Sequence, residues 1–151
     1  MRTRVAVPIV LAAVVLAASA CSNDSGTTSG EARIATSGGP VTVRVRIAET
    51  GEARAEGLQS VTELGADEGM AFLFGEPVRT TFWMRDTLLP LSIAFWGEDG
   101  LIVAISDMEP CTADPCPTYR PDDEFVGALE ANRGYFDRHG VEVGDHVAIV
   151  R

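Results

Sequence analysis

Apolar and polar residues alternate over much of this chain, in short runs that turn residues separate. From 41 to 47 the odd positions are apolar and the even positions are polar, a period of two that predicts a strand with one buried face. Short apolar runs at 71–74, 80–84, 125–129 and 146–150 predict further strands. The pattern is therefore mainly that of a β protein.

Two of the apolar runs are joined by a clear turn signal. Residues 91–96 and 101–106 flank the sequence Gly97-Glu98-Asp99-Gly100. An Asp-Gly pair between two apolar runs is typical of a β-hairpin, because both residues tolerate the backbone angles of a tight turn. We expect 91–96 and 101–106 to pair as neighbouring strands.

Two short helices are also expected. Thr50 is placed to cap a helix over 51–56, and Gly57 is placed to end it. A second helix is predicted over 132–139, with Asn132 as its cap and Gly140 just past its end.

The elements together predict one domain over residues 41–151. Many short strands joined by Gly and Pro turns, with one or two short helices and no internal repeat, indicate a compact antiparallel sandwich, a jelly-roll-like fold or a flattened barrel. A chain of this size can bury a real core.

The first twenty residues form a different kind of segment. Arg2 and Arg4 precede an apolar run over 5–16, and the segment ends in Ala18-Ser19-Ala20-Cys21. A positive start, an apolar core of about 7–15 residues and a small-residue end are the parts of an export signal. We therefore expect residues 1–20 to be a signal peptide.

The end of that segment resembles a bacterial lipobox, in which the cysteine is acylated after cleavage. This resemblance implies lipidation at Cys21 and an extracytoplasmic protein held to the cell membrane by its lipid anchor. Two alternatives stay open: an ordinary secretory site at Ala18-Ser19-Ala20, and a retained membrane helix, although a spanning helix needs roughly 20 apolar residues.

Residues 21–40 are expected to be a flexible linker between the anchor and the domain. They are rich in Ser, Gly and Thr, and Ile34 is their only large apolar residue. A segment of that composition buries too little apolar surface to offset the entropy lost on ordering.

The net charge of the chain limits the classes of molecule that it is expected to bind. The formal net charge is −10 at pH 7, and every basic residue apart from the two histidines is arginine. An acidic chain argues against a nucleic-acid partner, which would need a basic patch. A net negative charge also helps to keep an exported domain soluble. The sequence does not identify a protein partner.

Cys111 and Cys116 are expected to form a disulfide, because cysteine pairs outside the cytoplasm are usually oxidised. A redox pair or a metal site is the alternative. A redox pair typically has the spacing C-x-x-C, and zinc would need further ligands. The only histidines are His139 and His146, which nothing in the sequence places near the cysteines. We predict no metal and no cofactor.

The segment around Trp83 carries the clearest candidate binding residues. On a strand, Trp83 and Arg85 share one face, and an exposed ring beside a guanidinium would suit sugars, carboxylates and phosphates. Asp86, Thr87 and Tyr119 are the further candidate ligand contacts. The alternative is architectural: Trp83 lies in the core and Arg85 pairs with Asp86.

Two carboxylates could carry chemistry. Glu130 follows an apolar strand and Asp145 follows Gly144. Each could be a buried carboxylate that fixes loop amides, which we favour, or an acid for hydrolysis. Glycosidase chemistry would need two carboxylates close together in one cleft. The sequence contains no G-x-S-x-G, P-loop or H-E-x-x-H motif, so catalytic residues stay unknown.

Several segments together resemble one family. These are Gly57-Leu58, Gly69-Met70, the run from Phe82 to Leu91, the segment from Pro110 to Tyr119, Leu129-Glu130, Gly140-Val141 and Val143-Gly144-Asp145. They are similar to the bacterial and archaeal family called domain of unknown function 192. The resemblance implies a small, mostly β domain and no particular activity. Asp86 stands where asparagine is common in the family, and Ser92 where aspartate is common.

Three classes of function remain open. The first is a non-catalytic envelope module that binds a small polar ligand or glycan. The second is an interaction or assembly protein of the envelope. The third is a hydrolase acting on envelope material, for which two of Asp86, Glu130 and Asp145 would have to meet in one cleft.

Overall fold

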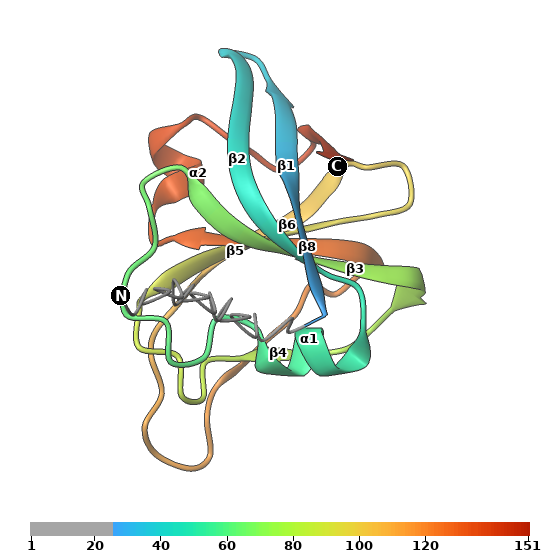
Figure 1. Ribbon diagram of the computed structural model, residues 1–151. Helices are drawn as coiled ribbons and strands as arrows, with labels where there is room; N and C mark the ends of the chain where they lie inside the picture. The colour runs from blue at the N-terminus through green and yellow to red at the C-terminus, as the bar shows by residue number, and fades with distance from the viewer. Residues whose placement is uncertain (1–25) are drawn as a thin grey trace, which may run out of the picture.

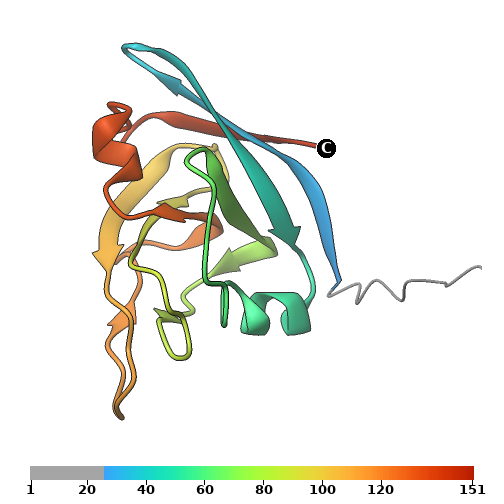
Figure 2. The ribbon, with the colours of Figure 1, turned by 60° about the vertical axis from the view of Figure 1, so that its left-hand side comes forward.

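The fold is a single curled sheet with a smaller two-stranded sheet beside it. The computed structural model describes residues 26–151 (Figures 1 and 2). The large sheet has seven strands in the order β6-β5-β8-β3-β2-β1-β9, and the small one pairs β4 with β7. The strands are β1 (Thr27–Thr36), β2 (Gly39–Ala48), β3 (Glu68–Val78), β4 (Phe82–Trp83), β5 (Leu91–Trp96), β6 (Ile102–Met108), β7 (Thr118–Tyr119), β8 (Phe125–Asn132) and β9 (His146–Val150). The prediction of a mainly β fold is confirmed.

The large sheet curls into a half-barrel. Its edge strands β6 and β9 approach each other through a bridge between Leu101 and His146, and the Val147 amide donates to the Gly100 carbonyl at 2.8 Å. One pair departs from the expected antiparallel arrangement, because β2 and β3 are parallel. A parallel pair needs a crossover connection, and helix α1 (Gly51–Glu56) lies in that connection.

The central strands are buried on both faces. All six residues of β5 are buried, and successive side chains on a strand point to opposite faces. One face packs on helix α2 (Tyr135–Arg138), whose Tyr135 and Phe136 are buried there. The other face packs on α1, the following Leu58 and β4. It is this second face that builds the candidate site.

Close packing inside the sheet is visible where β5 meets β8. Gly127 lies opposite Trp96, and a methyl group in place of its hydrogen would lie 2.1 Å from the indole Cζ2. The absence of a side chain at Gly127 is therefore what lets Trp96 lie flat within the buried face.

Three local predictions are confirmed. The Thr50 hydroxyl accepts from the Ala53 amide at 3.1 Å to cap α1. Gly57 ends that helix with φ 54°, a backbone angle that favours glycine. The strands β5 and β6 pair across the turn at 97–100 as expected.

The expected flexible linker is wrong from Thr27 onward. Strand β1 occupies most of that segment, pairs with β2 and β9 and places Ala32 and Ile34 in the core at 0% exposure (Figure 1). The segment buries little surface of its own, but two neighbouring strands supply the backbone partners and the apolar face that it lacks alone. The part of the linker at 21–25, with Cys21, lies outside the described residues, as does the signal peptide at 1–20.

Two other elements differ from expectation. The second helix is only Tyr135–Arg138, and its N-cap is Gly134 rather than Asn132. Asn132 ends strand β8 instead, and its amide nitrogen donates to the carbonyls of Leu64 and Gly65 at 3.2 and 2.9 Å. The run at 80–84 contributes only the two-residue strand β4, which pairs with β7.

The disulfide segment forms a long loop that projects from the domain (orange, Figure 2). Cys111 and Cys116 lie at disulfide distance, with Sγ–Sγ 2.12 Å and Cα–Cα 5.7 Å, in agreement with the expected pair.

Between residues 26 and 151, no helix is long and apolar enough to cross a membrane.

Candidate functional site

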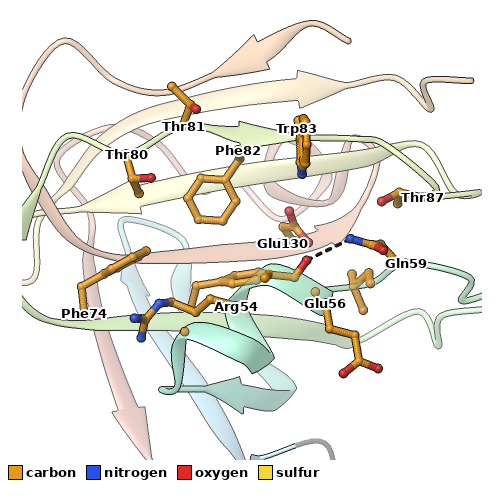
Figure 3. A pocket seen from close by; sticks show the side chains of 15 residues that line it. Arg54, Glu56, Gln59, Phe74, Thr80, Thr81, Phe82, Trp83, Thr87 and Glu130 are labelled. Atoms are coloured by element: carbon orange, nitrogen blue, oxygen red, sulfur yellow. Dashed lines mark hydrogen bonds between the residues drawn. The ribbon is translucent and has the colours of Figure 1, made fainter. Parts of the chain in front are cut away.

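A pocket of about 340 Å³ lies between α1, the sheet and β4 (Figure 3). A ligand of a single sugar ring's size fits a pocket of this volume, which is at the small end of the usual range. Its lining residues are Gly51, Arg54, Ala55, Glu56, Gly57, Leu58, Gln59, Phe72, Phe74, Thr80, Thr81, Phe82, Trp83, Thr87 and Glu130.

Helix α1 forms one side of the pocket and is fixed to the sheet by Arg54. One guanidinium nitrogen, Nη1, donates to the Glu49 carbonyl at 2.5 Å and to the Leu73 carbonyl at 2.9 Å. The guanidinium carbon lies 4.7 Å from the centre of the Phe74 ring, within cation–π distance (Figure 3). Arg54 therefore holds the helix against β3.

Aromatic rings form the apolar part of the lining. Phe82 lies edge to face with Phe72 at 5.0 Å between ring centres, and Phe74 lies edge to face with Phe125 at 5.5 Å. Edge-to-face rings at these separations attract each other and resist rearrangement. The pocket wall is consequently preformed.

Glu130 points into the pocket from β8 (Figure 3). Strand alternation puts it on the same face as Ala128 and opposite Leu129 and Ala131. The residue is only 5% exposed, and its burial raises the pKa of the carboxyl group to about 8. Its carboxyl group opens onto the pocket, and the buried side-chain atom that lacks a hydrogen-bond partner among residues 26–151 is Arg85 Nε. Glu130 is therefore a largely buried acid that is reached from the pocket.

Trp83 stands at the rim of the pocket. Its side chain is 51% exposed, and Figure 3 shows the indole edge-on with its nitrogen turned toward the pocket. The guanidinium carbon of Arg85 lies 4.9 Å from the ring centre. Arg85 itself pairs with Asp114 of the disulfide loop. The architectural alternative is wrong for both residues: Trp83 is not core, and Arg85 does not pair with Asp86.

The other three candidate contacts lie in different places. Thr87 is buried and lines the pocket. Asp86 lies with Arg85 in a separate depression of about 110 Å³ beside the disulfide. Tyr119 is half-buried against the core, and its hydroxyl accepts from the Glu109 amide at 3.4 Å. The structure thus brings Trp83 and Thr87 to the pocket but neither Asp86 nor Tyr119.

The backbone conformation at Asp86 suits its residue type. Asp86 has φ 56°, in the left-handed region that asparagine and aspartate tolerate better than other non-glycine residues. Ser92 likewise keeps a polar role, because its hydroxyl donates to Asp107 at 2.5 Å and accepts from the Gly134 amide at 2.8 Å.

The expected role of a buried carboxylate that fixes loop amides is met in part by Asp145, which is half-buried, and is wrong for Glu130. Asp145 accepts from the Glu142 amide at 2.8 Å in the turn before β9. Glu130 lines the pocket, Asp86 lines the depression beside the disulfide, and Asp145 lines neither. The paired-carboxylate arrangement that hydrolysis would require is not formed by these three residues. Within the described residues, no group of three or more His, Cys, Asp or Glu side chains is placed to hold a metal ion.

Sequence reasoning missed much of the pocket lining. Gln59 and the helix residues reach the site only because α1 packs on the sheet, which no local pattern reveals. The apolar pattern predicts a strand that contains Phe72 and Phe74, but it does not indicate that they line a site. Thr80 and Thr81 precede the Trp83 motif directly, and their hydroxyls were the one local signal that could have extended the site.

The chain matches the model of the DUF192 family, described as "Uncharacterized ACR", over residues 32–149. The chain belongs to the DUF192 family. The match includes at least part of every strand of the large sheet and the whole candidate pocket. No curated protein matches this chain.

Two solved structures have the same fold as this DUF192 domain. A protein of unknown function from Novosphingobium aromaticivorans DSM 12444 is 33% identical with a TM-score of 0.77, over 84% of this chain and 89% of that one. A protein from Sinorhizobium meliloti 1021, described as a candidate transcription regulator, is 30% identical with a TM-score of 0.73, over 82% of this chain and 95% of that one.

Proposed function

We propose that this DUF192 domain is a non-catalytic binding module that holds a small hydroxylated ligand, such as a sugar, in the pocket beneath α1. The observation that carries the proposal is the exposed Trp83 ring at the rim of a preformed pocket. An exposed tryptophan costs solvation free energy that a stacked ligand would recover.

The polar part of the lining supports a hydroxylated ligand. Thr80 and Thr81 are exposed hydroxyls, and Thr87 places a third hydroxyl inside the pocket. Gln59 uses its nitrogen to bond the Ala55 carbonyl at 2.9 Å, so its amide oxygen can accept from a ligand (Figure 3). Sugar-binding sites combine aromatic side chains, which stack on the sugar ring, with polar side chains, which hydrogen-bond to the sugar hydroxyls.

A binding role fits the site better than hydrolysis or DNA binding. Hydrolysis by the predicted carboxylates is disfavoured because, of Asp86, Glu130 and Asp145, only Glu130 lines the pocket. The regulator description of the Sinorhizobium meliloti protein is not carried over, since a net charge of −10 gives this chain no general attraction for nucleic acid.

We further propose that the module works outside the cytoplasm as a lipoprotein anchored through Cys21. The support is the charged, apolar and small-residue order of residues 1–20 and the cysteine that follows it. The disulfide pair at Cys111 and Cys116 is consistent with an oxidising compartment.

Calorimetric titration of the full chain with glucose and N-acetylglucosamine tests the binding proposal. We expect at least one sugar to bind, and Trp83→Ala to weaken its affinity by about tenfold or more, because a stacked aromatic contributes roughly 1 kcal/mol or more beyond its buried area. The melting temperature should hardly change, since Trp83 is half exposed.

Leu88→Ala is the matched control. Leu88 is 55% exposed, lies five positions from Trp83 and does not line the pocket. It should bind sugar as the unmodified chain does. Equal affinities for the unmodified chain and Trp83→Ala, or no sugar binding at all, would contradict the proposal.

A further inference from the structure

The carboxyl group of Glu130 opens onto the pocket and forms no ion pair within residues 26–151. From the chemistry around it we infer that the ligand carries a protonated amine, which pairs with Glu130 while the hydroxylated part of the ligand contacts Trp83. This inference rests on the proposed function and narrows it to amine-bearing hydroxylated ligands such as amino sugars.

The first argument is the position of the carboxyl group. Glu130 is only 5% exposed, yet it lines the pocket, so its carboxyl group is reached from the pocket. A charged group in such a place is costly unless an opposite charge pairs with it. A ligand amine offers three donors and the opposite charge, whereas a hydroxyl offers one donor and no charge.

The second argument is the absence of a competing protein cation. Among residues 26–151, Arg54 is the only basic residue that lines the pocket, and its guanidinium is already held by two backbone carbonyls and the Phe74 ring. Arg85 lies outside the pocket lining and pairs with Asp114. No free cation among the described residues is therefore placed to pair with an ionised Glu130, so its counter-charge would come from a ligand.

The third argument is the aromatic lining. Phe72, Phe82 and Trp83 line the same pocket as Glu130. The face of an aromatic ring is negative and attracts a cation, most strongly where water is excluded. A carboxyl group in a pocket that is also lined by aromatic rings suits an ammonium group better than it suits a neutral or anionic one.

Binding of an ammonium group would also move a proton. Near pH 6 the free pocket holds Glu130 in its neutral form, because burial raises its pKa to about 8. When the ammonium ligand enters, the O–H bond of the carboxyl group breaks, its electron pair stays on the carboxylate, and the proton passes to the buffer. A ligand hydroxyl bonded to neutral Glu130 would release no proton.

Calorimetry of the full chain with glucosamine, glucose and N-acetylglucosamine at pH 6 separates these cases. The three probes share a sugar ring, and only glucosamine is cationic. We expect glucosamine to bind about tenfold tighter than the other two. We also expect its binding enthalpy to differ between two buffers of different ionisation enthalpy, by an amount that corresponds to release of about one proton.

Two variants assign the preference to Glu130. Glu130→Gln keeps the shape of the side chain and should reduce the preference for glucosamine to less than about twofold and abolish proton release. Glu76→Gln removes an exposed acid that does not line the pocket, and it should leave both almost unchanged. A variant that has lost its fold is recognised by its circular dichroism spectrum.

The outcomes distinguish this inference from the proposed function. If glucose and glucosamine bind equally and both depend on Trp83, the amine inference is overturned and the binding module stands. If glucosamine is preferred equally by Glu130→Gln and the unmodified chain, the assignment to Glu130 is overturned. If none of the three probes binds, both the inference and the proposed function are overturned.

Discussion

A single buried acid gives this molecule its most distinctive residue-level property. Glu130 has an ordinary pKa of 4.5 in an unfolded chain and a pKa of about 8 in the folded one, because burial disfavours its charged form. Between these two values the unfolded chain has lost the proton and the folded chain keeps it. The free energy of unfolding therefore falls as the pH rises through this window.

Glu130→Gln should remove that dependence. The free energy of unfolding of the unmodified chain, minus that of Glu130→Gln, should fall by about 1.4 kcal/mol per pH unit between about pH 5 and 8, and level off above. Urea denaturation of both proteins at pH 5, 6, 7 and 8 measures the difference.

The comparison isolates Glu130 because Arg54 and Glu56, the other charged residues that line the pocket, are present in both proteins. Parallel pH profiles for the two proteins would show that Glu130 is not a buried neutral acid.

The residues of the Trp83 motif show how far local pattern extends. Alternation along 82–85 predicts opposite faces for exposed Trp83 and buried Met84, as observed, whereas Phe82 and Arg85 are both half-buried. The same pattern could not show that Arg85 turns toward Asp114, because that partner comes from a loop nearly thirty positions away. Local periodicity predicts on which face of a strand a side chain lies, and tertiary packing determines which residues it contacts.

At the scale of elements, the contact between β5 and β8 determines whether the sheet can pack. Gly127→Ala should lower the free energy of unfolding by about 1–3 kcal/mol, because the added methyl group would lie 2.1 Å from Trp96 and force the ring to move. Chemical denaturation followed by circular dichroism measures the change.

Gly75→Ala is the control, since a methyl group there would meet nothing within 4 Å. Its free energy of unfolding should stay within about 0.5 kcal/mol of the unmodified chain. Equal stability of the two variants would mean that Trp96 does not pack on Gly127 as described.

The disulfide loop supports β4 from the other side. A backbone bridge joins Cys111 to Arg85, and the Cys111 amide donates to the Met84 carbonyl at 3.2 Å. Replacing both Cys111 and Cys116 with serine should lower the free energy of unfolding by about 2 kcal/mol, the chain-entropy value for so short a loop. Thermal and urea denaturation check this, and an unchanged free energy would argue that the loop is not closed by a covalent bond.

Elements that are stabilised by local signals could be predicted from the sequence, whereas elements that depend on tertiary contacts could not. The capped helix at 51–56 and the hairpin at 91–106 contain their own signals, namely a cap, a terminating glycine and an Asp-Gly turn, so both were predictable. Strand β1 has a linker's composition and becomes a strand because β2 and β9 pair with it. The pocket escaped prediction for the same reason, since α1, β3, β4 and β8 meet there only in the folded chain.

At the scale of the whole molecule, the start of β1 at Thr27 limits how far an anchored domain could lie from the membrane. With lipidation at Cys21, only residues 22–26 separate the anchor from β1, a distance of at most about 18 Å when fully extended. Gly26 lies near Thr50 and Ala53 of the α1 region, which carries one wall of the pocket. An anchored domain would therefore keep its pocket close to the membrane rather than on a long tether.

Cys21→Ser tests the anchor. Incorporation of labelled palmitate should be lost, and the protein should move from the membrane fraction to the soluble fraction, because two buried acyl chains are what would hold it. The Cys111 and Cys116 serine variants should remain in the membrane fraction. Unchanged labelling and fractionation of Cys21→Ser would contradict the lipoprotein proposal.

The most direct test of the binding account is a map of where a sugar contacts the folded domain. In an NMR titration of the full chain with glucosamine, the account predicts shifts of the Trp83 indole signal and of the amides of Gly57, Gln59 and Thr87, all of which line the pocket. Signals of the groove between Ser29, Arg46 and Glu63 should stay in place. Shifts confined to that groove, or none at the pocket, would contradict the account.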